Sequence, residues 1–482
     1  MAHPGARYHA PVSGLTEVPV GALSPDRYRR VLTADQWRAF AEGIERARRL
    51  FTGRTIWMVN STARGGGVAE MLTALLPYVC GAGLDARWLV IEGDPDFFRV
   101  TKRVHNHLHG AAGDGGALDD PARRVYESVT GQRGAELAEL VGRRDLVVLH
   151  DPQTAGMLPA VKRRGVPVVW RCHVGIDMPD DLARDAWRFL LPYVSPADAW
   201  VFSRRAFAWE GLDPTRVAVI PPSIDPFSPK NAEMPRDQVA AILGAAGLSD
   251  PPAEGAEFQR LRGDMAPIVH RAVMCEDTRI GPETKLVLQV SRWDRLKDPV
   301  GVIRGFASQV VGRCDAHLML AGPSVAEVAD DPEGAEVYAE SVAVWRGLPA
   351  AARARVHLAC LPMDDDEENA AMVNALQRRA TVVVQKSLAE GFGLTVAEAM
   401  WKGRPVLASR IGGIQDQIED GVTGLLLDDP RDLDAFGRLT CGLLLDPAAA
   451  RRMGEAAQRR VRERFLGTRH LLQYVDLLGS LL

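Results

Sequence analysis

The chain has 482 residues, of which 46% are hydrophobic and 25% are charged, and its formal net charge is −4. This balance excludes the basic composition typical of proteins that bind nucleic acids or anionic membranes, so any phosphate site has to be a local arrangement. The N-terminal residues lack the apolar core of a secretory signal, and no run of about 18 apolar residues occurs. We therefore expect a soluble, cytoplasmic protein whose partners include neither nucleic acid nor a membrane.

The first half of the chain alternates short β-branched runs with amphipathic stretches, a pattern typical of parallel strands connected by helices. The predicted strands cover residues 54–60, 86–92, 146–150, 166–172, 199–203 and 216–222. Several are apolar on both faces, as expected of strands that helices cover on both sides. Residues 105–120 are rich in glycine and polar side chains, and we predict a surface loop there.

The second half repeats this rhythm, with predicted strands at residues 285–291, 317–323, 355–360, 381–385, 404–409 and 424–427. Two such series predict an α/β protein with two Rossmann-like, doubly wound domains. We predict an N-terminal domain over residues 1–225, of which residues 1–50 are an extension. A linker with an insertion follows over residues 226–283. The C-terminal domain covers residues 284–460, and a final helix covers residues 461–482. Packing of the final helix back on the N-terminal domain is one option that the sequence leaves open.

Residues 385–409 (QKSLAEGFGLTVAEAMWKGRPVLAS) carry the most information about function. A predicted strand ends at the start of this segment, a glycine-containing turn follows, and a helix begins near Gly393. The backbone amides of Gly393, Leu394 and Thr395 then lie at the positive end of the helix dipole. Free amides at a helix N-terminus form a natural binding site for phosphate.

Two glutamates flank this phosphate site. Glu390 precedes the predicted helix and Glu398 lies about one turn inside it. Carboxylates on both sides of a bound diphosphate can accept hydrogen bonds from sugar hydroxyls. The alternative is a strand–turn–helix unit with two incidental glutamates on a solvated face.

Two cations follow the first predicted strand of the C-terminal domain. In the segment 289–303 the strand leads into Arg292 and, five residues later, Lys297. This edge of a parallel sheet is where such folds bind ligands, and the cations would offset charge that develops on a departing diphosphate. Arg295 is a competing cation, and the alternative is a pair of solvated basic residues.

The first strand–helix turn of the N-terminal domain contains three consecutive glycines, Gly65, Gly66 and Gly67. They would let the backbone approach a bound ligand, with the next helix starting near Val68. The string does not match G-x-G-x-x-G, so a dinucleotide site is disfavoured. A purely structural turn is the alternative.

Polar residues also follow two other predicted strands of the N-terminal domain. His150, Asp151 and Gln153 end one of them, and His173 and Asp177 follow the next. Carboxylates, amides and imidazoles are the groups that a sugar acceptor needs. Each histidine has the alternative of being a satisfied structural residue.

We expect no metal and no cofactor. The letters D-x-D occur within residues 364–366, but this acidic run precedes a helical pattern, so helix capping explains it better than metal binding. Six cysteines are scattered without a Cys-x-x-Cys pair, which favours reduced thiols over a zinc site or disulfides.

The segment 385–409 closely resembles the E-x7-E signature of retaining glycosyltransferases of the GT-B architecture, in which two Rossmann-like domains face each other across a cleft. The resemblance implies that Glu398 binds the nucleotide ribose, that Glu390 binds the donor sugar, and that the amides of residues 393–395 bind the diphosphate. It makes Arg292 and Lys297 donor-binding and catalytic residues as well, and Glu390 catalytic. It also places Gly66 and Gly67 beside the donor and His173, as a catalytic residue, near the donor sugar; the acceptor-binding candidates are Asp151, Gln153 and Asp177.

The strings HDPQ (150–153), WRCH (170–173) and PPSIDPFSPKN (221–231) look specifically like the trehalose glycosyltransferring synthases and the related retaining trehalose phosphorylases. This likeness spans roughly residues 54–465, with interruptions. It implies front-face transfer of glucose from an NDP-glucose such as UDP- or ADP-glucose to free glucose, which gives α,α-trehalose. Phosphorolysis through glucose 1-phosphate, a non-catalytic sugar-nucleotide sensor and a nucleotide-sugar epimerase remain as alternatives, and a homodimer is left open.

Overall fold

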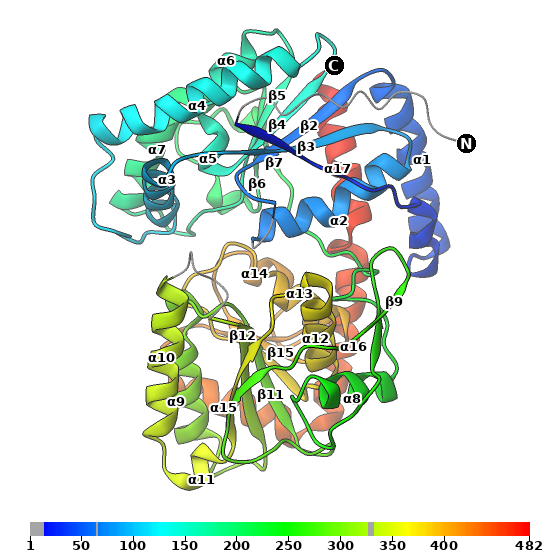
Figure 1. The fold of residues 1–482 in the computed structure, drawn as a ribbon, viewed down its shortest axis with the longest axis vertical. Coiled ribbons are helices and arrows are strands. Elements are labelled where there is room, and N and C mark those ends of the chain that lie inside the picture. The colour runs from blue at the N-terminus through cyan, green and yellow to red at the C-terminus, as the bar shows by residue number, and fades with distance from the viewer. Residues whose placement is uncertain (1–13, 64–65, 326–331) are drawn as a thin grey trace. The chain divides into compact units, whose positions relative to one another are not determined.

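The computed structural model describes residues 14–63, 66–325 and 332–482 of the chain (Figure 1). These residues form two compact units. The N-terminal unit runs to Pro222 and also takes in residues 467–482, whereas the C-terminal unit is the continuous segment Ser223–Leu466. Both units have a parallel-rich sheet between helices, which confirms the predicted fold class of two Rossmann-like domains.

Within the described residues, the N-terminal sheet has seven strands in the order β1-β3-β2-β4-β5-β6-β7. Strand β1 pairs antiparallel with β3, and all other neighbours are parallel. The strands are β1 (Leu15–Val18), β2 (Thr55–Asn60), β3 (Asp85–Ile91), β4 (Leu146–His150), β5 (Val168–Cys172), β6 (Ala199–Phe202) and β7 (Val217–Val219).

Helices cover both faces of this sheet, because its strands are apolar on both sides. Along β2, Trp57 and Val59 join one hydrophobic cluster, while Ile56 and Met58 join another on the opposite face. The helices of the unit are α1 (Ala34–Phe51), α2 (Gly67–Gly81), α3 (Pro95–Leu108), α4 (Asp120–Leu140), α5 (Asp151–Ala155), α6 (Leu158–Lys162), α7 (Asp181–Val194) and α17 (Gly467–Ser480), with 3-10 turns η1 (Pro25–Arg30), η2 (Arg205–Phe207) and η3 (Pro214–Arg216).

In the described part of the C-terminal unit, the main sheet has seven strands in the order β10-β13-β12-β11-β14-β15-β16. Strand β10 is antiparallel to β13, and the other pairs are parallel. The strands are β10 (Val273–Cys275), β11 (Leu286–Val290), β12 (His317–Pro323), β13 (Val356–Leu361), β14 (Val382–Gln385), β15 (Val406–Ser409) and β16 (Leu425–Leu427). The helices are α8 (Arg236–Ala245), η4 (Arg295–Lys297), α9 (Pro299–Gln309), α10 (Pro332–Arg346), α11 (Ala350–Arg353), α12 (Asp366–Arg379), α13 (Leu394–Trp401), α14 (Ile414–Gln417), α15 (Leu433–Leu445) and α16 (Pro447–Arg464).

The segment that we expected to be a linker with an insertion belongs to the C-terminal unit. It contributes helix α8, the hairpin β8 (Glu257–Gln259) and β9 (Met265–Pro267), and the edge strand β10. Ion pairs from Arg260 to Asp365 and Glu367 fasten the hairpin to the start of α12. The insertion is therefore an integral part of this unit.

The predicted surface loop over residues 105–120 is wrong at its beginning. Helix α3 continues to Leu108 because His107 and Leu108 are buried against the unit. In the remainder, both oxygens of Asp114 accept hydrogen bonds from Arg103, at 2.7 and 2.8 Å.

Among the described residues, no helix combines the length and the apolar character needed to cross a membrane.

Candidate active site

The turn from β14 to α13 presents backbone amides at the carboxyl edge of the C-terminal sheet. Gly393 is the N-cap of α13 and has a φ of 82°, a left-handed conformation that favours glycine. No side chain caps this helix within the described residues, so its first turn, which begins with Leu394 and Thr395, keeps its amides available. The arrangement suits an anionic ligand such as a phosphate.

A lysine and a glutamate meet beside this helix. Nζ of Lys297, the last residue of η4, donates a hydrogen bond of 2.6 Å to Oε2 of Glu390. Both side chains are largely buried, and Ser387 also contacts Oε2 of Glu390 through its hydroxyl, at 3.4 Å. Lys297 and Glu390, both predicted from the sequence, therefore lie side by side. Together they offer a cation for a phosphate and a carboxylate for hydroxyl groups.

The two arginines near Lys297 differ in their surroundings. Arg292 keeps 57% of its side chain exposed and pairs with Asp294 in its own loop, at 3.0 Å. Arg295 instead pairs with Glu336 and Glu340 on the exposed surface of α10. Arg295 is thus engaged in a surface ion pair, and Arg292 is the freer of the two cations for a ligand.

Buried polar residues that the sequence analysis did not identify contact the loop between β11 and α9, which carries Lys297. Nε2 of Gln289, on β11, donates to the carbonyl of Lys297 at 2.9 Å. The fully buried ammonium of Lys386 pairs with Asp298, which has a left-handed φ of 50° and caps α9. These contacts fix the backbone on both sides of the Lys297–Glu390 pair. Lysines and glutamines in or after strands are common, so the sequence alone did not indicate that Gln289 and Lys386 support this loop.

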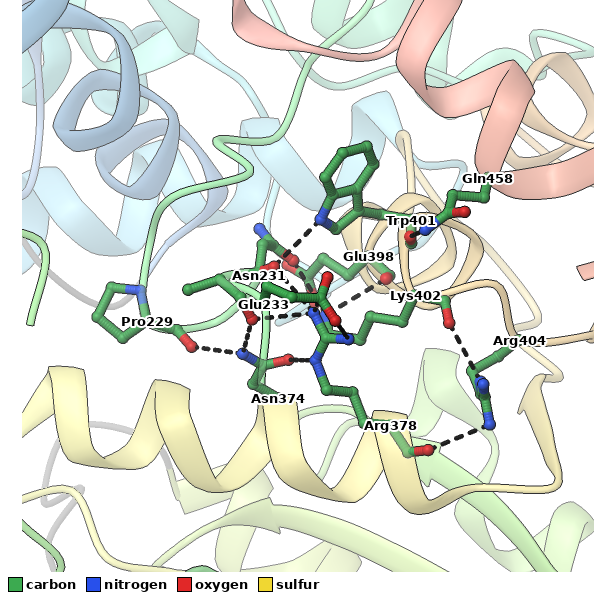
Figure 2. Close-up of polar contacts among 11 residues, drawn as sticks. Pro229, Asn231, Glu233, Asn374, Arg378, Glu398, Trp401, Lys402, Arg404 and Gln458 are labelled. Carbon is green, nitrogen blue, oxygen red and sulfur yellow. Dashed lines mark hydrogen bonds and ion pairs between the residues drawn. The ribbon is translucent and has the colours of Figure 1, made fainter. Parts of the chain in front are cut away.

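Glu398 lies one turn inside α13 (Figure 2). It is only 1% exposed. Its Oε2 is 3.4 Å from Nε2 of Gln377, on α12, and its Oε1 is 3.7 Å from Nζ of Lys230. The next turn of the chain brings Lys402 to the carbonyl of Glu398, at 3.3 Å. A buried carboxylate is thus held among donors, none of which the local sequence pattern identified.

In the N-terminal unit, His150 is the last residue of β4 and His173 directly follows β5, and their rings stack at 15°. Nδ1 of His150 lies 3.1 Å from Nε2 of His173. Burial, reinforced by the charge of Arg171, lowers the pKa of His150 to about 3 and holds that of His173 well below its usual range. Nε of Arg171 faces Nδ1 of His173 at 3.4 Å, which assigns the proton of His173 to Nε2. Both ring nitrogens of His173 therefore have partners inside this unit.

The guanidinium of Arg171 is fully buried and is held by the last helix of the chain. It contacts Nε2 of His470 at 3.1 Å and the hydroxyl of Tyr474 at 2.8 Å, both on α17, and donates to the carbonyl of Ile220 at 3.0 Å. The tail from about residue 447 was expected to form two helical stretches, the last of them over residues 461–482. The structure has α16 to Arg464 and α17 from Gly467, and α17 belongs to the N-terminal unit.

The three residues proposed to bind the acceptor differ in their surroundings. Asp151 has a left-handed φ of 64°, accepts a hydrogen bond from the backbone N–H of His173 at 2.7 Å, and has its pKa raised to about 7 by burial. Asp177 forms an ion pair with Arg204. Oε1 of Gln153 is buried without a hydrogen-bond partner among the described residues. Gln153 is therefore the one of the three with an unsatisfied buried acceptor atom.

The glycine-rich turn of the N-terminal unit leads directly into α2. Gly66 is the N-cap of this helix, Gly67 is its first residue, and no side chain of the described residues caps it. Gly65 lies outside the described residues.

The acidic run that contains the D-x-D string caps a helix, as the capping interpretation predicts. Asp365 accepts hydrogen bonds from the amides of Glu367 and Glu368 at the start of α12.

Comparison with known families agrees with this two-part organisation. Residues 58–209 match the family described as trehalose synthase, N-terminal domain. Residues 274–460 match the family described as glycosyl transferases group 1. Each match falls within one structural unit.

Named relatives extend the similarity over most of the chain. The chain is 32% identical to a trehalose synthase from Pyrococcus horikoshii over 96% of its own length and 97% of the relative's. It is 28% identical to a trehalose phosphorylase from Pleurotus sajor-caju, with 90% of this chain aligned to only 59% of that protein.

A solved structure titled as trehalose-6-phosphate from E. coli bound with UDP-2-fluoro glucose superimposes with a TM-score of 0.64, at 13% identity, covering 88% of this chain and 99% of that one. At this identity the likeness concerns the fold, and it agrees with the GT-B class. The likeness to a trehalose synthase covers nearly the full length of both proteins. The chain therefore belongs to the trehalose synthase family, and it is a glycosyltransferase of the GT-B class.

Proposed function

We propose that the protein is a retaining glucosyltransferase that moves glucose from an NDP-glucose to free glucose and forms α,α-trehalose. The observation that carries this proposal is the 2.6 Å contact between Lys297 and Glu390 beside the uncapped start of α13. A cation, a carboxylate and free amides at one sheet edge match the parts of a sugar diphosphate.

On this proposal, the diphosphate is bound by the amides of Gly393, Leu394 and Thr395 together with Lys297 and Arg292. Negative charge grows on the leaving diphosphate as the glycosidic bond breaks. Fixed positive groups that face this charge stabilise the transition state more than the ground state. No metal is required, because these groups supply the positive charge that a metal ion would otherwise provide.

The two glutamates take the sugar ends of the donor. Glu390 accepts hydrogen bonds from hydroxyls of the transferred glucose, and Glu398 accepts them from the ribose of the nucleotide. The solved relative of the same fold, whose title names bound UDP-2-fluoro glucose, supports a nucleotide-sugar donor for this class of protein.

The acceptor glucose is bound by residues of the N-terminal unit. We assign this role to Gln153, whose buried carbonyl oxygen has no partner in the part of the chain that the structure describes, and to Asp151 and Asp177. His173 orients the reacting sugar, and Gly66 and Gly67 let the backbone come close to the ligands. Both ring nitrogens of His173 have partners inside the unit, so the imidazole reaches the sugar by exchanging its contact with His150 for one with a hydroxyl.

The chemical step is a front-face displacement. The anomeric C1–O bond to the β-phosphate breaks while the acceptor hydroxyl forms a new C1–O bond on the same face. The hydroxyl proton passes to an oxygen of the departing β-phosphate, so the products are trehalose and a protonated nucleoside diphosphate. The protein supplies positioning and charge stabilisation rather than a general base.

A trehalose phosphorylase activity is the second candidate, because one relative at 28% identity carries that name. Two observations weigh against it. The chain covers 59% of that phosphorylase but 97% of the Pyrococcus synthase. In addition, glucose 1-phosphate has no ribose to engage the buried carboxylate of Glu398.

A donor panel tests the proposal. UDP-, ADP- and GDP-glucose, and separately glucose 1-phosphate, are incubated with glucose, and the product is identified by proton NMR. Formation of α,α-trehalose from at least one NDP-glucose, undiminished by EDTA, is the expected result. A β linkage excludes retention, product from glucose 1-phosphate alone favours the phosphorylase, and nucleotide binding without product favours a sensor.

A further inference from the structure

Lys402, the residue that directly follows α13, has its ammonium group buried inside the C-terminal unit (Figure 2). The residue is 4% exposed. Its Nζ donates to Oε1 of Gln377 at 2.7 Å, to Oδ1 of Asn231 at 3.0 Å and to the carbonyl of Glu398 at 3.3 Å. An ammonium has three N–H donors, so these three acceptors satisfy it completely.

This ammonium fixes the orientation of the Gln377 side-chain amide. Because an ammonium can only donate, the oxygen of the amide has to face Lys402, and the NH2 group then has to point the other way. That NH2 group faces Oε2 of Glu398 at 3.4 Å. Reversal of the amide would place two donors against each other and two acceptors against each other. The charge on Lys402 thus determines that Glu398 faces a donor.

The same ammonium holds the chain segment that carries a second donor for Glu398. Asn231 accepts from Lys402, and its carbonyl accepts from Nε1 of Trp401 at 3.1 Å. Nδ2 of Asn374 donates to the carbonyl of Pro229 at 2.9 Å (Figure 2). These bonds hold Lys230, which lies between Pro229 and Asn231, with its Nζ 3.7 Å from Oε1 of Glu398.

Burial of a lysine for packing alone would cost free energy of desolvation without a compensating contact. Burial lowers the pKa of Lys402, and the neighbouring cations Arg378 and Lys230 act in the same direction, whereas Glu398 and Glu233 oppose it. A methionine of similar length would fill the space without this desolvation penalty. The charge therefore serves the polar contacts that only an ammonium can make.

We propose that Lys402 is a positioning residue for the donor nucleotide: through Gln377 and Asn231 it holds the Glu398 carboxylate in the orientation that receives the ribose hydroxyls. This inference rests on the proposed function, in which Glu398 binds the ribose. It adds a residue that touches no substrate and acts only through Glu398.

The test compares two ligands that differ only in the hydroxyls concerned. The dissociation constant is measured by calorimetry for the tightest binder among UDP, ADP and GDP, and for its 2′,3′-dideoxy counterpart. We expect Lys402→Met to weaken the ribonucleotide at least tenfold and the dideoxynucleotide less than twofold, since the latter cannot bond to Glu398. Equal weakening of both ligands, or no weakening of either, overturns the positioning role.

Two further variants keep the outcome clear. Gln377→Glu retains an acceptor for Lys402 but removes the N–H that faces Glu398, so the same selective loss is expected even if Lys402→Met unfolds; unchanged ribonucleotide affinity contradicts the proposal. Lys285→Met removes an exposed lysine just before β11, whose Nζ donates to the carbonyl of Leu444 at 3.1 Å and contacts none of these residues, and should change neither constant. Melting curves check that each variant is folded.

Glu398→Gln separates failure of this inference from failure of the proposed function. Selective loss of ribonucleotide binding in Glu398→Gln, without such loss in Lys402→Met and Gln377→Glu, overturns the role of Lys402 alone. Equal effects of Glu398→Gln on both ligands overturn the ribose assignment, and the role of Lys402 then falls with it.

Discussion

Nζ of Lys297 lies 2.6 Å from Oε2 of Glu390, although 93 residues separate the two in the sequence. Their side chains keep only 16% and 12% of their surface exposed, so each charge depends on the other for compensation. The pair holds both groups at the carboxyl edge of the C-terminal sheet. A donor can exchange this contact for two of its own, a phosphate on the lysine and hydroxyls on the glutamate.

Removal of the two cations that we propose bind the diphosphate should lower kcat as well as affinity for the donor. Lys297→Ala and Arg292→Ala are each expected to reduce kcat by about 10²–10³, because a preorganised electrostatic partner of the transition state is lost. The double variant should lose less than the product of the two, since both cations act on one diphosphate. Steady-state kinetics with saturating donor measures this.

Arg295→Ala is the matched control for these variants. Arg295 lies in the same loop but pairs with Glu336 and Glu340 on an exposed surface, where an ion pair contributes about 0–1 kcal/mol. Its kcat should equal that of the wild type. Near-wild-type kcat in both Lys297→Ala and Arg292→Ala would instead place the diphosphate elsewhere.

Glu398→Ala should weaken donor binding with little effect on the chemical step. Each lost hydrogen bond to a charged carboxylate is worth about 1.5–3 kcal/mol, so the KM for the donor and the Kd for the nucleotide should rise together. Glu233→Ala serves as control, because the side chain of Glu233 is 83% exposed and pairs with Arg378 at the surface. Unchanged donor KM and Kd in Glu398→Ala would show that the ribose lies elsewhere.

Gly393→Ala should reduce both stability and kcat. The φ of 82° costs a residue with a Cβ about 1–2 kcal/mol, and the new methyl would lie 3.3 Å from Cγ of Glu390 and 3.1 Å from Ile414. Gly421→Ala has a similar φ of 75° but no atom within 4 Å, so it should lose stability alone. A kcat loss that is equal in both variants would separate the effect from Glu390.

Acid should destabilise the N-terminal unit. His150, His173 and His470 have pKa values lowered by burial, so below about pH 6.5 the unfolded state binds protons that the folded state does not. The free energy of unfolding should therefore fall as the pH decreases, by about 1.4 kcal/mol per pH unit for each histidine. Asp151, with its raised pKa, binds a proton in the folded state and offsets about one of the three.

Hydrogen exchange of the β4 and β5 amides, corrected for intrinsic rates, measures this acid effect between about pH 7 and about pH 5. In His470→Gln the decline should be less steep, because one of the neutral histidines is absent. Protection that is constant or increases towards acid would contradict the neutral state of the cluster.

The sequence predicted every strand that is buried on both faces, because such strands are continuous apolar runs. It missed the short strands β1, β8, β9 and β10, in which exposed side chains interrupt the apolar pattern. Residues 105–108 were assigned to a loop because their polar letters outweighed two buried side chains, His107 and Leu108.

The candidate site could be predicted where chemistry is local in the sequence. Glu390, Glu398 and Lys297 adjoin strand ends and a glycine-rich turn, which are visible as patterns. Lys402 and Arg171 could not be recognised, since the partners that give them meaning, such as Asn231 and His470, come from segments 171 and 299 positions away. Only the fold shows why a charged side chain is buried at these positions.

The attachment of α17 to the N-terminal unit has a consequence for biosynthesis. A ribosome delivers the residues up to Pro222 before the C-terminal unit, and only after that unit the helix that carries His470 and Tyr474. Until then, the guanidinium of Arg171 lacks two of its hydrogen-bond partners. The half of the protein that is translated first is therefore the half that completes its core last, while the continuous C-terminal unit can fold as soon as it emerges.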